Sequence, residues 1–160
     1  MITYRAAKFD DVEKIHKLLN DYAKAGLMLP RSRNAIYENL RDYIVAMQGS
    51  HLVGCGALHF VWDRLAEIRS LAVDPELKCT GIGRNIVELL EKEGIERGVK
   101  MFFTLTYQPG FFAKCNYIET AKEKLPQKVW KECVYCPQYP YCNEIAFVKT
   151  TVDYQPGDIL

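Results

Sequence analysis

LKCTGIGRNI, residues 77–86, places two glycines one residue apart at the start of an amphipathic run that predicts a helix over residues 81–97. A proline-marked loop, residues 74–76, precedes it, and the apolar residues 65–73 before that loop predict a strand. Backbone N–H groups of residues 79–84 would then point outward at the positive end of a helix dipole, where a diphosphate can be held. The glycine spacing matches neither the Walker loop nor the dinucleotide fingerprint, so those two phosphate loops are excluded.

On both sides of this loop, the chain alternates strands with helices, which predicts a layered α/β domain. The expected strands are residues 2–6, 43–47, 52–62, 65–73, 99–105 and 144–149. The first expected helix follows a capping pair at Asp10 and Glu13 and stops at Gly26. The other expected helices are residues 34–42, 81–97 and 111–115, and residues 121–142 are expected to be irregular. Residues 43–73 predict an antiparallel meander.

Length and charge limit the class of protein. A chain of 160 residues predicts one domain, residues 1–150, with a C-terminal tail over residues 151–160. A formal net charge of +1 gives no broad electrostatic case for a nucleic acid or an anionic membrane as partner. Because no apolar h-region or membrane-length apolar run is present, we expect a cytoplasmic protein whose six cysteines are thiols or ligands.

The glycine loop carries a family resemblance. Residues 71–84 resemble the acetyl-coenzyme-A binding motif of the GNAT N-acetyltransferase superfamily, Gln/Arg-x-x-Gly-x-Gly/Ala, with Lys78 in its first place. Residues 111–117, FFAKCNY, resemble the family segment Phe-Tyr-Glu-Lys-x-Gly-Phe, which packs near the pantetheine arm. The resemblance implies a central, mostly antiparallel mixed sheet with flanking helices, and acetyl-CoA as co-substrate. The coenzyme-binding residues that it implies are Leu71, Ala72, Val73, Lys78, Cys79, Thr80, Gly81, Ile82, Gly83, Arg84, Phe111 and Phe112.

Within that superfamily, the chain resembles the bacterial amino-acid N-acetyltransferases that make N-acetylglutamate for arginine biosynthesis, in the short form without a kinase domain. The segments that carry this resemblance are residues 26–32, 54–59, 66–73 and 125–130. It implies direct transfer of acetyl from acetyl-CoA to the α-amine of an amino acid, with L-glutamate as the expected acceptor. A protein or another small amine as acceptor, and a non-catalytic sensor that binds acyl-CoA or metal, remain alternatives. A homodimer is also left open.

The predicted strand over residues 65–73 supplies a candidate catalytic base. By alternation, Glu67, Arg69, Leu71 and Val73 are expected on one face, with residues two apart separated by roughly 6.5–7 Å. A carboxylate and a cation could thus flank one small molecule, and the resemblance supports Glu67 as the base, acting through water. The alternative for Glu67 and Arg69 is a charge pair on a wet sheet face.

The leaving thiolate needs a proton or solvent help. Phe112 stands where many superfamily members have the tyrosine that donates this proton, and a phenyl ring cannot donate one. Either the thiolate leaves with solvent help, or Tyr107 serves as the acid; a packing role for Tyr107 is the alternative. Cys79 and Asn116 also stand where many relatives have glycine, and asparagine tolerates positive φ.

Substrate choice is expected to depend on cations, because a dicarboxylic amino acid suits bidentate guanidinium pairing. The candidates are Arg31, Arg33 and Arg69, with Lys128 as a weaker option.

His59 is a candidate proton relay or a structural histidine.

The late cysteines form a separate candidate site. Cys133, Cys136 and Cys142 have a spacing compatible with a structural zinc site, whose fourth ligand could be Cys115 or Glu144. Free buried thiols, or an iron–sulfur or redox role, are the alternatives.

Overall fold

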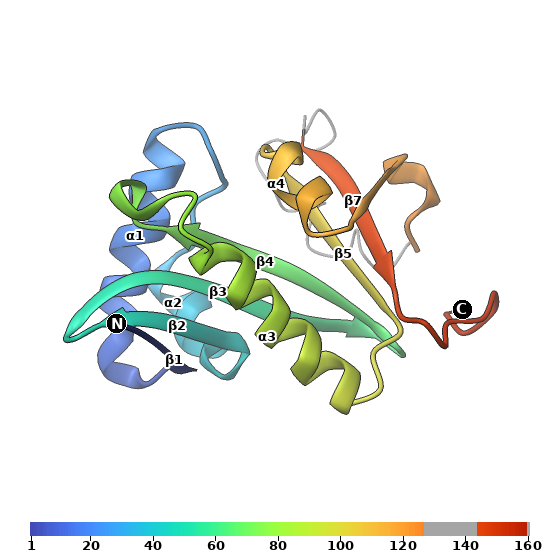
Figure 1. Ribbon diagram of the computed structural model, residues 1–160, viewed down its shortest axis with the longest axis horizontal. Helices are drawn as coiled ribbons and strands as arrows, with labels where there is room; N and C mark the ends of the chain where they lie inside the picture. Colours follow the sequence, from blue (N-terminus) through green and yellow to red (C-terminus); the bar gives the residue numbers. More distant parts are fainter. Residues whose placement is uncertain (127–143, 160) are drawn as a thin grey trace. The chain divides into compact units, whose positions relative to one another are not determined.

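The computed structural model describes residues 1–126 and 144–159 (Figure 1). Its strands form one sheet with the order β1-β2-β3-β4-β5-β7-β6. The strands are β1 Ile2–Ala6, β2 Tyr43–Gln48, β3 His51–Trp62, β4 Leu65–Val73, β5 Met101–Thr106, β6 Ile118–Thr120 and β7 Ile145–Thr150. The helices are α1 Val12–Lys24, α2 Arg33–Glu38, α3 Ile82–Glu96 and α4 Pro109–Lys114. Only the β4–β5 pairing is parallel among the strand pairings whose register is resolved, so the predicted α/β class with a mostly antiparallel sheet is confirmed.

The described chain forms two compact units. The first contains Met1–His59 and Ile68–Glu93, and the second contains Phe60–Glu67 and the described part of Gly94–Leu160. β4 runs through both, because its first three residues belong to the second unit and the rest to the first.

In the first unit, α1 and α3 cover opposite faces of the sheet (Figure 1). The apolar stripe of α1 packs with α2 and with inward-facing residues of β2 and β3; this cluster includes Val12, Ile15, Leu19, Tyr22, Ile36, Tyr43, Val45, Met47, Cys55, Ala57 and Ala72. On the other face, a Cβ at Gly56 would lie 2.7 Å from Ile86 Cγ2 of α3. Glycine at this position of β3 therefore lets α3 approach the sheet closely.

The start of α1 differs from the prediction. A 3-10 turn, Phe9–Asp11, precedes the helix, and Asp11 rather than Asp10 accepts a hydrogen bond from the Lys8 N–H at 2.7 Å. Glu13 instead pairs with Arg33 Nε at 2.7 Å. The predicted capping pair of Asp10 and Glu13 is wrong, because the extra turn moves the first helical residue to Val12.

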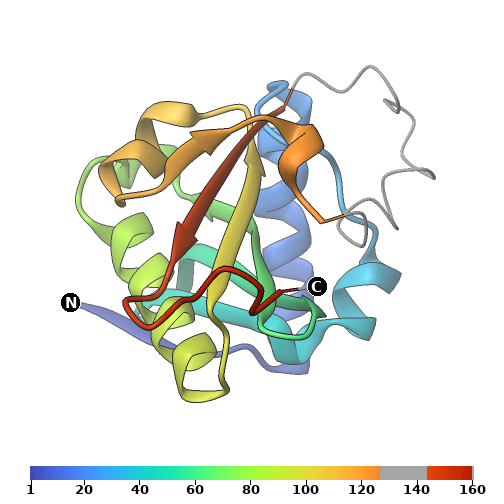
Figure 2. The same ribbon diagram turned by 90° about the vertical axis from the view of Figure 1, so that its right-hand side faces the viewer.

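The second unit is built on β5, β7 and β6, which lie side by side in Figure 2. β5 pairs antiparallel with β7 from Met101 to Thr106, and a core forms around Leu65, Phe103, Leu125 and Ala146. Ile159 of the expected tail packs against this core, so the tail is part of the unit. β6 was not expected, and the expected helix over residues 34–42 divides into α2 and a 3-10 turn, Leu40–Asp42.

Candidate functional site

The loop between β4 and α3 has a defined backbone conformation. The Asp74 carboxylate accepts a hydrogen bond from the Glu76 N–H at 3.0 Å, and the Thr80 hydroxyl donates to the Leu77 carbonyl at 2.6 Å. These short-range bonds replace a regular ladder, so the loop is ordered by its own polar side chains.

The end of this loop presents the N-terminus of α3. Gly81 has φ +91° and Cys79 has φ +64°, so two left-handed residues separated by Thr80 turn the chain into the helix. The Asn85 N–H donates to the Gly81 carbonyl at 3.0 Å, which is the start of the helical hydrogen-bond series. N–H groups in the turn before Asn85 thus point out of the helix at its positive end.

The last residues of β4 expose one backbone edge. The Asp74 N–H donates to the Val53 carbonyl of β3 at 2.8 Å, so residue 74 faces β3. Because backbone groups alternate between the two edges of a strand, those of Leu71 and Val73 face away from β3. The resolved pairing of β4 with β5 covers only Leu65–Glu67. An extended ligand could therefore pair with the Leu71 backbone and the Val73 N–H.

Tyr22, near the end of α1, contacts both β4 and the loop. Its hydroxyl donates to the Val73 carbonyl, and Lys78 Nζ lies 5.3 Å from the centre of its ring. The side chain is 6% exposed, and burial raises the pKa of Tyr22, so the hydroxyl stays protonated as a donor. The sequence marked Tyr22 only as part of an apolar stripe, and periodicity carries no information about the partner of a hydroxyl group.

Two of the predicted substrate arginines act on one buried hydroxyl. Tyr43 is 3% exposed, and its hydroxyl lies 3.2 Å from Ser70 Oγ. Burial raises the pKa of Tyr43, while the Ser70 hydrogen bond and the charges of Arg31 and Arg69 act in the opposite direction. Arg31 and Arg69 are therefore both within electrostatic range of the same hydroxyl. Arg33 is exposed and pairs with Glu13 instead.

Ser70 has a left-handed backbone conformation within β4, with φ +55°. Its hydroxyl meets Tyr43, and Ala72 packs in the same cluster as Tyr43, so residues 70 and 72 lie on the face that α1 covers. Leu71 lies on the α3 face, where its Cδ1 would be 3.1 Å from a Cβ at Gly56. That Arg69 shares this face with Leu71 stays a prediction.

The remaining predicted catalytic residues lie in the second unit. Glu67 is half-buried on β4 opposite Phe103 of β5, and Tyr107 is half-buried directly after β5. Phe112 is 4% exposed, with ring centres 5.1 Å from Phe111 and 5.3 Å from Tyr117. Phe112 is therefore an aromatic packing residue of α4, and the roles of Glu67 and Tyr107 stay predictions.

The other predicted side chains fall into two groups. His59 Nδ1 lies 2.8 Å from Asp42 Oδ2, so this histidine has a carboxylate partner. Lys128 and the three late cysteines, Cys133, Cys136 and Cys142, lie outside the described residues. Within residues 1–126 and 144–159, no three His, Cys, Asp or Glu side chains gather as a metal site.

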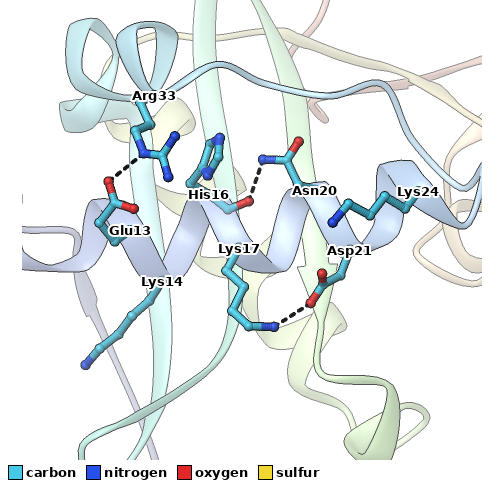
Figure 3. A pocket seen from close by; sticks show the side chains of 8 residues that line it. All are labelled: Glu13, Lys14, His16, Lys17, Asn20, Asp21, Lys24 and Arg33. Carbon is cyan, nitrogen blue, oxygen red and sulfur yellow. Dashed lines mark hydrogen bonds and ion pairs between the residues drawn. The ribbon is translucent and has the colours of Figure 1, made fainter.

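A polar pocket lies on the outer face of α1, apart from the loop between β4 and α3 (Figure 3). Most of its lining groups have partners: Lys17 pairs with Asp21 at 2.9 Å, and Asn20 Nδ2 donates to the His16 carbonyl at 2.9 Å. Apart from Arg33, it contains no predicted site residue.

Among the described helices, none combines the length and hydropathy that a bilayer crossing requires.

Comparison with known proteins adds the decisive observation. The model of the Acetyltransferase (GNAT) family matches residues 12–117, which include α1, β4, the glycine loop and α4. The chain belongs to the GNAT family. It is therefore an acetyltransferase with acetyl-CoA as co-substrate, and the loop between β4 and α3 is the segment that resembles the coenzyme motif of GNAT proteins.

Individual GNAT relatives are similar over most of the chain. An uncharacterized N-acetyltransferase of Chlorobaculum tepidum is 44% identical over 146 residues, covering 91% of this chain and 94% of the relative. The amino-acid acetyltransferase of Mycobacterium tuberculosis is 34% identical over 131 residues, covering 80% of this chain and 75% of the relative.

Solved structures have the same fold. A Mycobacterium tuberculosis protein in complex with CoA has a TM-score of 0.81 at 27% identity, covering 94% of this chain and 99% of that one. The N-acetylglutamate synthase of Neisseria gonorrhoeae, complexed with coenzyme A and N-acetyl-glutamate, has a TM-score of 0.84 at 22% identity, with 94% of this chain covered. This chain spans 35% of that synthase, so the likeness is one of fold alone.

Proposed function

We propose that the protein transfers acetyl from acetyl-CoA to the α-amine of L-glutamate. The observation that supports this proposal is that the charges of Arg31 and Arg69 both favour a lower pKa for the Tyr43 hydroxyl, so both lie within its electrostatic range in the first unit. Two guanidinium groups within electrostatic range of one hydroxyl suit a ligand with two carboxylates, because each guanidinium can pair with a carboxylate through two hydrogen bonds. The 34% identical relative named amino-acid acetyltransferase supports the same class of acceptor.

The coenzyme would bind at the loop and the exposed edge of β4. N–H groups of residues 79–84 would hold the diphosphate, with Lys78 beside it. The Leu71 backbone and the Val73 N–H would pair with the pantetheine arm as an added strand does, while the Val73 carbonyl accepts a hydrogen bond from the Tyr22 hydroxyl. Phe111, half-buried on α4 in the second unit, stays a predicted coenzyme contact on the family resemblance alone.

The chemistry is an acyl transfer in which the acceptor nitrogen attacks the thioester carbonyl carbon. A carbon–nitrogen bond forms, the carbon–sulfur bond breaks, and CoA leaves as a thiolate. Glu67, two residues before Arg69 on β4, would take one ammonium proton through water. Tyr107 would give its proton to the thiolate and regain one, through solvent, from the second proton that the nitrogen loses as the amide forms. The product, N-acetylglutamate, would feed arginine biosynthesis in the cytoplasm.

Three arginine variants test the acceptor site. We expect Arg31→Lys and Arg69→Lys each to raise the KM for glutamate by about tenfold or more, because lysine cannot pair bidentately. The KM for acetyl-CoA should change by less than about twofold. Arg33→Lys should leave both KM values unchanged, because Arg33 pairs with Glu13. Glutamate turnover with an unchanged KM in the Arg31 and Arg69 variants would remove the acceptor site from this place.

A further inference from the structure

Tyr22 joins three parts of the first unit that are distant in sequence. It belongs to α1, its hydroxyl binds the Val73 carbonyl at the end of β4, and its ring lies beside the Lys78 ammonium in the loop. Val12, Ile15 and Leu19 are the other buried residues of α1, so Tyr22 is the one member of this stripe that carries a hydroxyl.

The hydroxyl contact falls on the edge of β4 that faces away from β3. The Asp74 N–H faces β3, so the Val73 carbonyl points to the opposite edge, and Tyr22 reaches that edge from α1. The Tyr22 hydroxyl therefore holds the orientation of the peptide group between residues 73 and 74, where the loop begins.

The ring contact acts further along the same loop. A lysine side chain on a surface loop has many rotamers, and ordering it on binding costs free energy. A cation held over an aromatic ring is attracted to it by about 0.5–1 kcal/mol at exposed sites. Tyr22 thereby limits the positions that the Lys78 ammonium can occupy before any ligand binds.

We propose that Tyr22 is a positioning residue for the coenzyme: it holds the Val73 carbonyl with its hydroxyl and Lys78 with its ring, so that the loop is preorganised for the diphosphate. This inference rests on the proposed location of the coenzyme at residues 78–84. Tyr22 itself touches no reacting atom; it acts through the loop.

The test measures CoA binding to the full chain by calorimetry, with Tyr22→Phe, Tyr22→Leu, Lys78→Met and the Tyr22→Leu/Lys78→Met double variant. Tyr22→Phe removes only the hydroxyl and should raise the Kd for CoA about fivefold or more. Lys78→Met should weaken binding in the parent chain but by a clearly smaller factor in the Tyr22→Leu background, because the ring that places the ammonium is absent. Tyr37→Phe, an exposed tyrosine on α2, is the matched control and should leave the Kd unchanged.

Kinetics separate positioning from a role in stability. Tyr22→Phe should raise the KM for acetyl-CoA and leave the KM for glutamate within about twofold. A Tyr22→Phe protein that melts earlier but binds CoA as tightly as the parent would overturn the proposal. Fully additive effects of Tyr22→Leu and Lys78→Met would overturn it as well.

Gly81→Val distinguishes failure of this inference from failure of the coenzyme site. Because Gly81 has φ +91°, valine there is strained, and CoA binding should weaken by about tenfold or more if the loop holds the diphosphate. Unchanged CoA affinity in both Gly81→Val and Lys78→Met would reject the proposed loop site, and the inference with it. Weakened binding in those two variants, with Tyr22→Phe unchanged, would reject the role of Tyr22 alone.

Discussion

Cys79 occupies a backbone conformation that favours glycine. Its φ is +64°, and Asn116 has a similar φ of +68°, although asparagine tolerates this region better than cysteine does. Glycine relieves the strain of the left-handed conformation, but it also adds conformational entropy to the unfolded chain, which partly offsets this gain. We expect Cys79→Gly to raise the free energy of unfolding by a net amount of about 0.5–1 kcal/mol. Asn116→Gly is the matched control and should give a clearly smaller gain in urea unfolding. A Cys79→Gly protein less stable than the parent would contradict this account of the loop.

Glu67 is the proposed base, and its substitution tests proton removal from the acceptor amine rather than a binding contact. Glu67→Gln keeps the size of the side chain but cannot accept the proton, so kcat should fall about 100-fold or more, with little change in the KM for acetyl-CoA. Steady-state rates at saturating acetyl-CoA measure this directly. Turnover equal to that of the parent chain would assign the base to another group.

Some residue-scale features could be predicted from the sequence and others could not. The positive φ of Asn116 agrees with the tolerance expected of its residue type. Tyr22 and Tyr43 were visible only as apolar positions, because periodicity shows which side chains are buried and not which polar atoms their hydroxyls meet. Arg33 was grouped with Arg31 by sequence proximity, but it begins α2 and pairs with Glu13.

At the scale of elements, the start of α1 depends on one buried carboxylate. Asp11 is 3% exposed and accepts hydrogen bonds from Arg5 at 2.7 and 3.0 Å. The hydrogen bond from Arg5 is the main cause that lowers the pKa of Asp11, with burial acting against it. A lowered pKa in the folded state adds stability above the unfolded value of about 3.9, and this stability is lost as the pH falls through the folded value.

Asp11→Asn should therefore lower the free energy of unfolding at pH 7 by about 1–3 kcal/mol. The difference between variant and parent should shrink as the pH falls below about 4, because the parent carboxylate becomes protonated there. Asp10→Asn, at the neighbouring exposed position, should change stability by less than about 0.5 kcal/mol. Urea unfolding at several pH values measures both, and a difference that stays constant down to pH 2 would rule out the ionised pair as its source.

β4 shows what the hydrophobic pattern reveals about an element and what it does not. Its bounds agree with the prediction, because a long apolar run between turn residues is a strong signal. The left-handed conformation of Ser70 was not predictable, since serine is not a residue type that marks a left-handed position. The three residues of β6 are too few to show any period.

At the scale of the whole molecule, the alternation of strands and helices predicted the fold class, and the glycine loop indicated the family. Both are confirmed by the sheet order and by the family match over residues 12–117. That match includes parts of both compact units. The single domain, the homodimer and the metal site at the late cysteines stay predictions.

The central claim is acetyl transfer to glutamate, and one measurement tests it most directly. The purified protein is incubated with acetyl-CoA and each of the common amino acids in turn, and the acetylated product is followed by mass spectrometry, because the six cysteines of the chain would disturb a thiol-release assay. We predict N-acetylglutamate as the main product, with other amino acids acetylated at least about tenfold more slowly, because they lack the second carboxylate. Acetylation of a different amine, with glutamate left unmodified, would contradict the account.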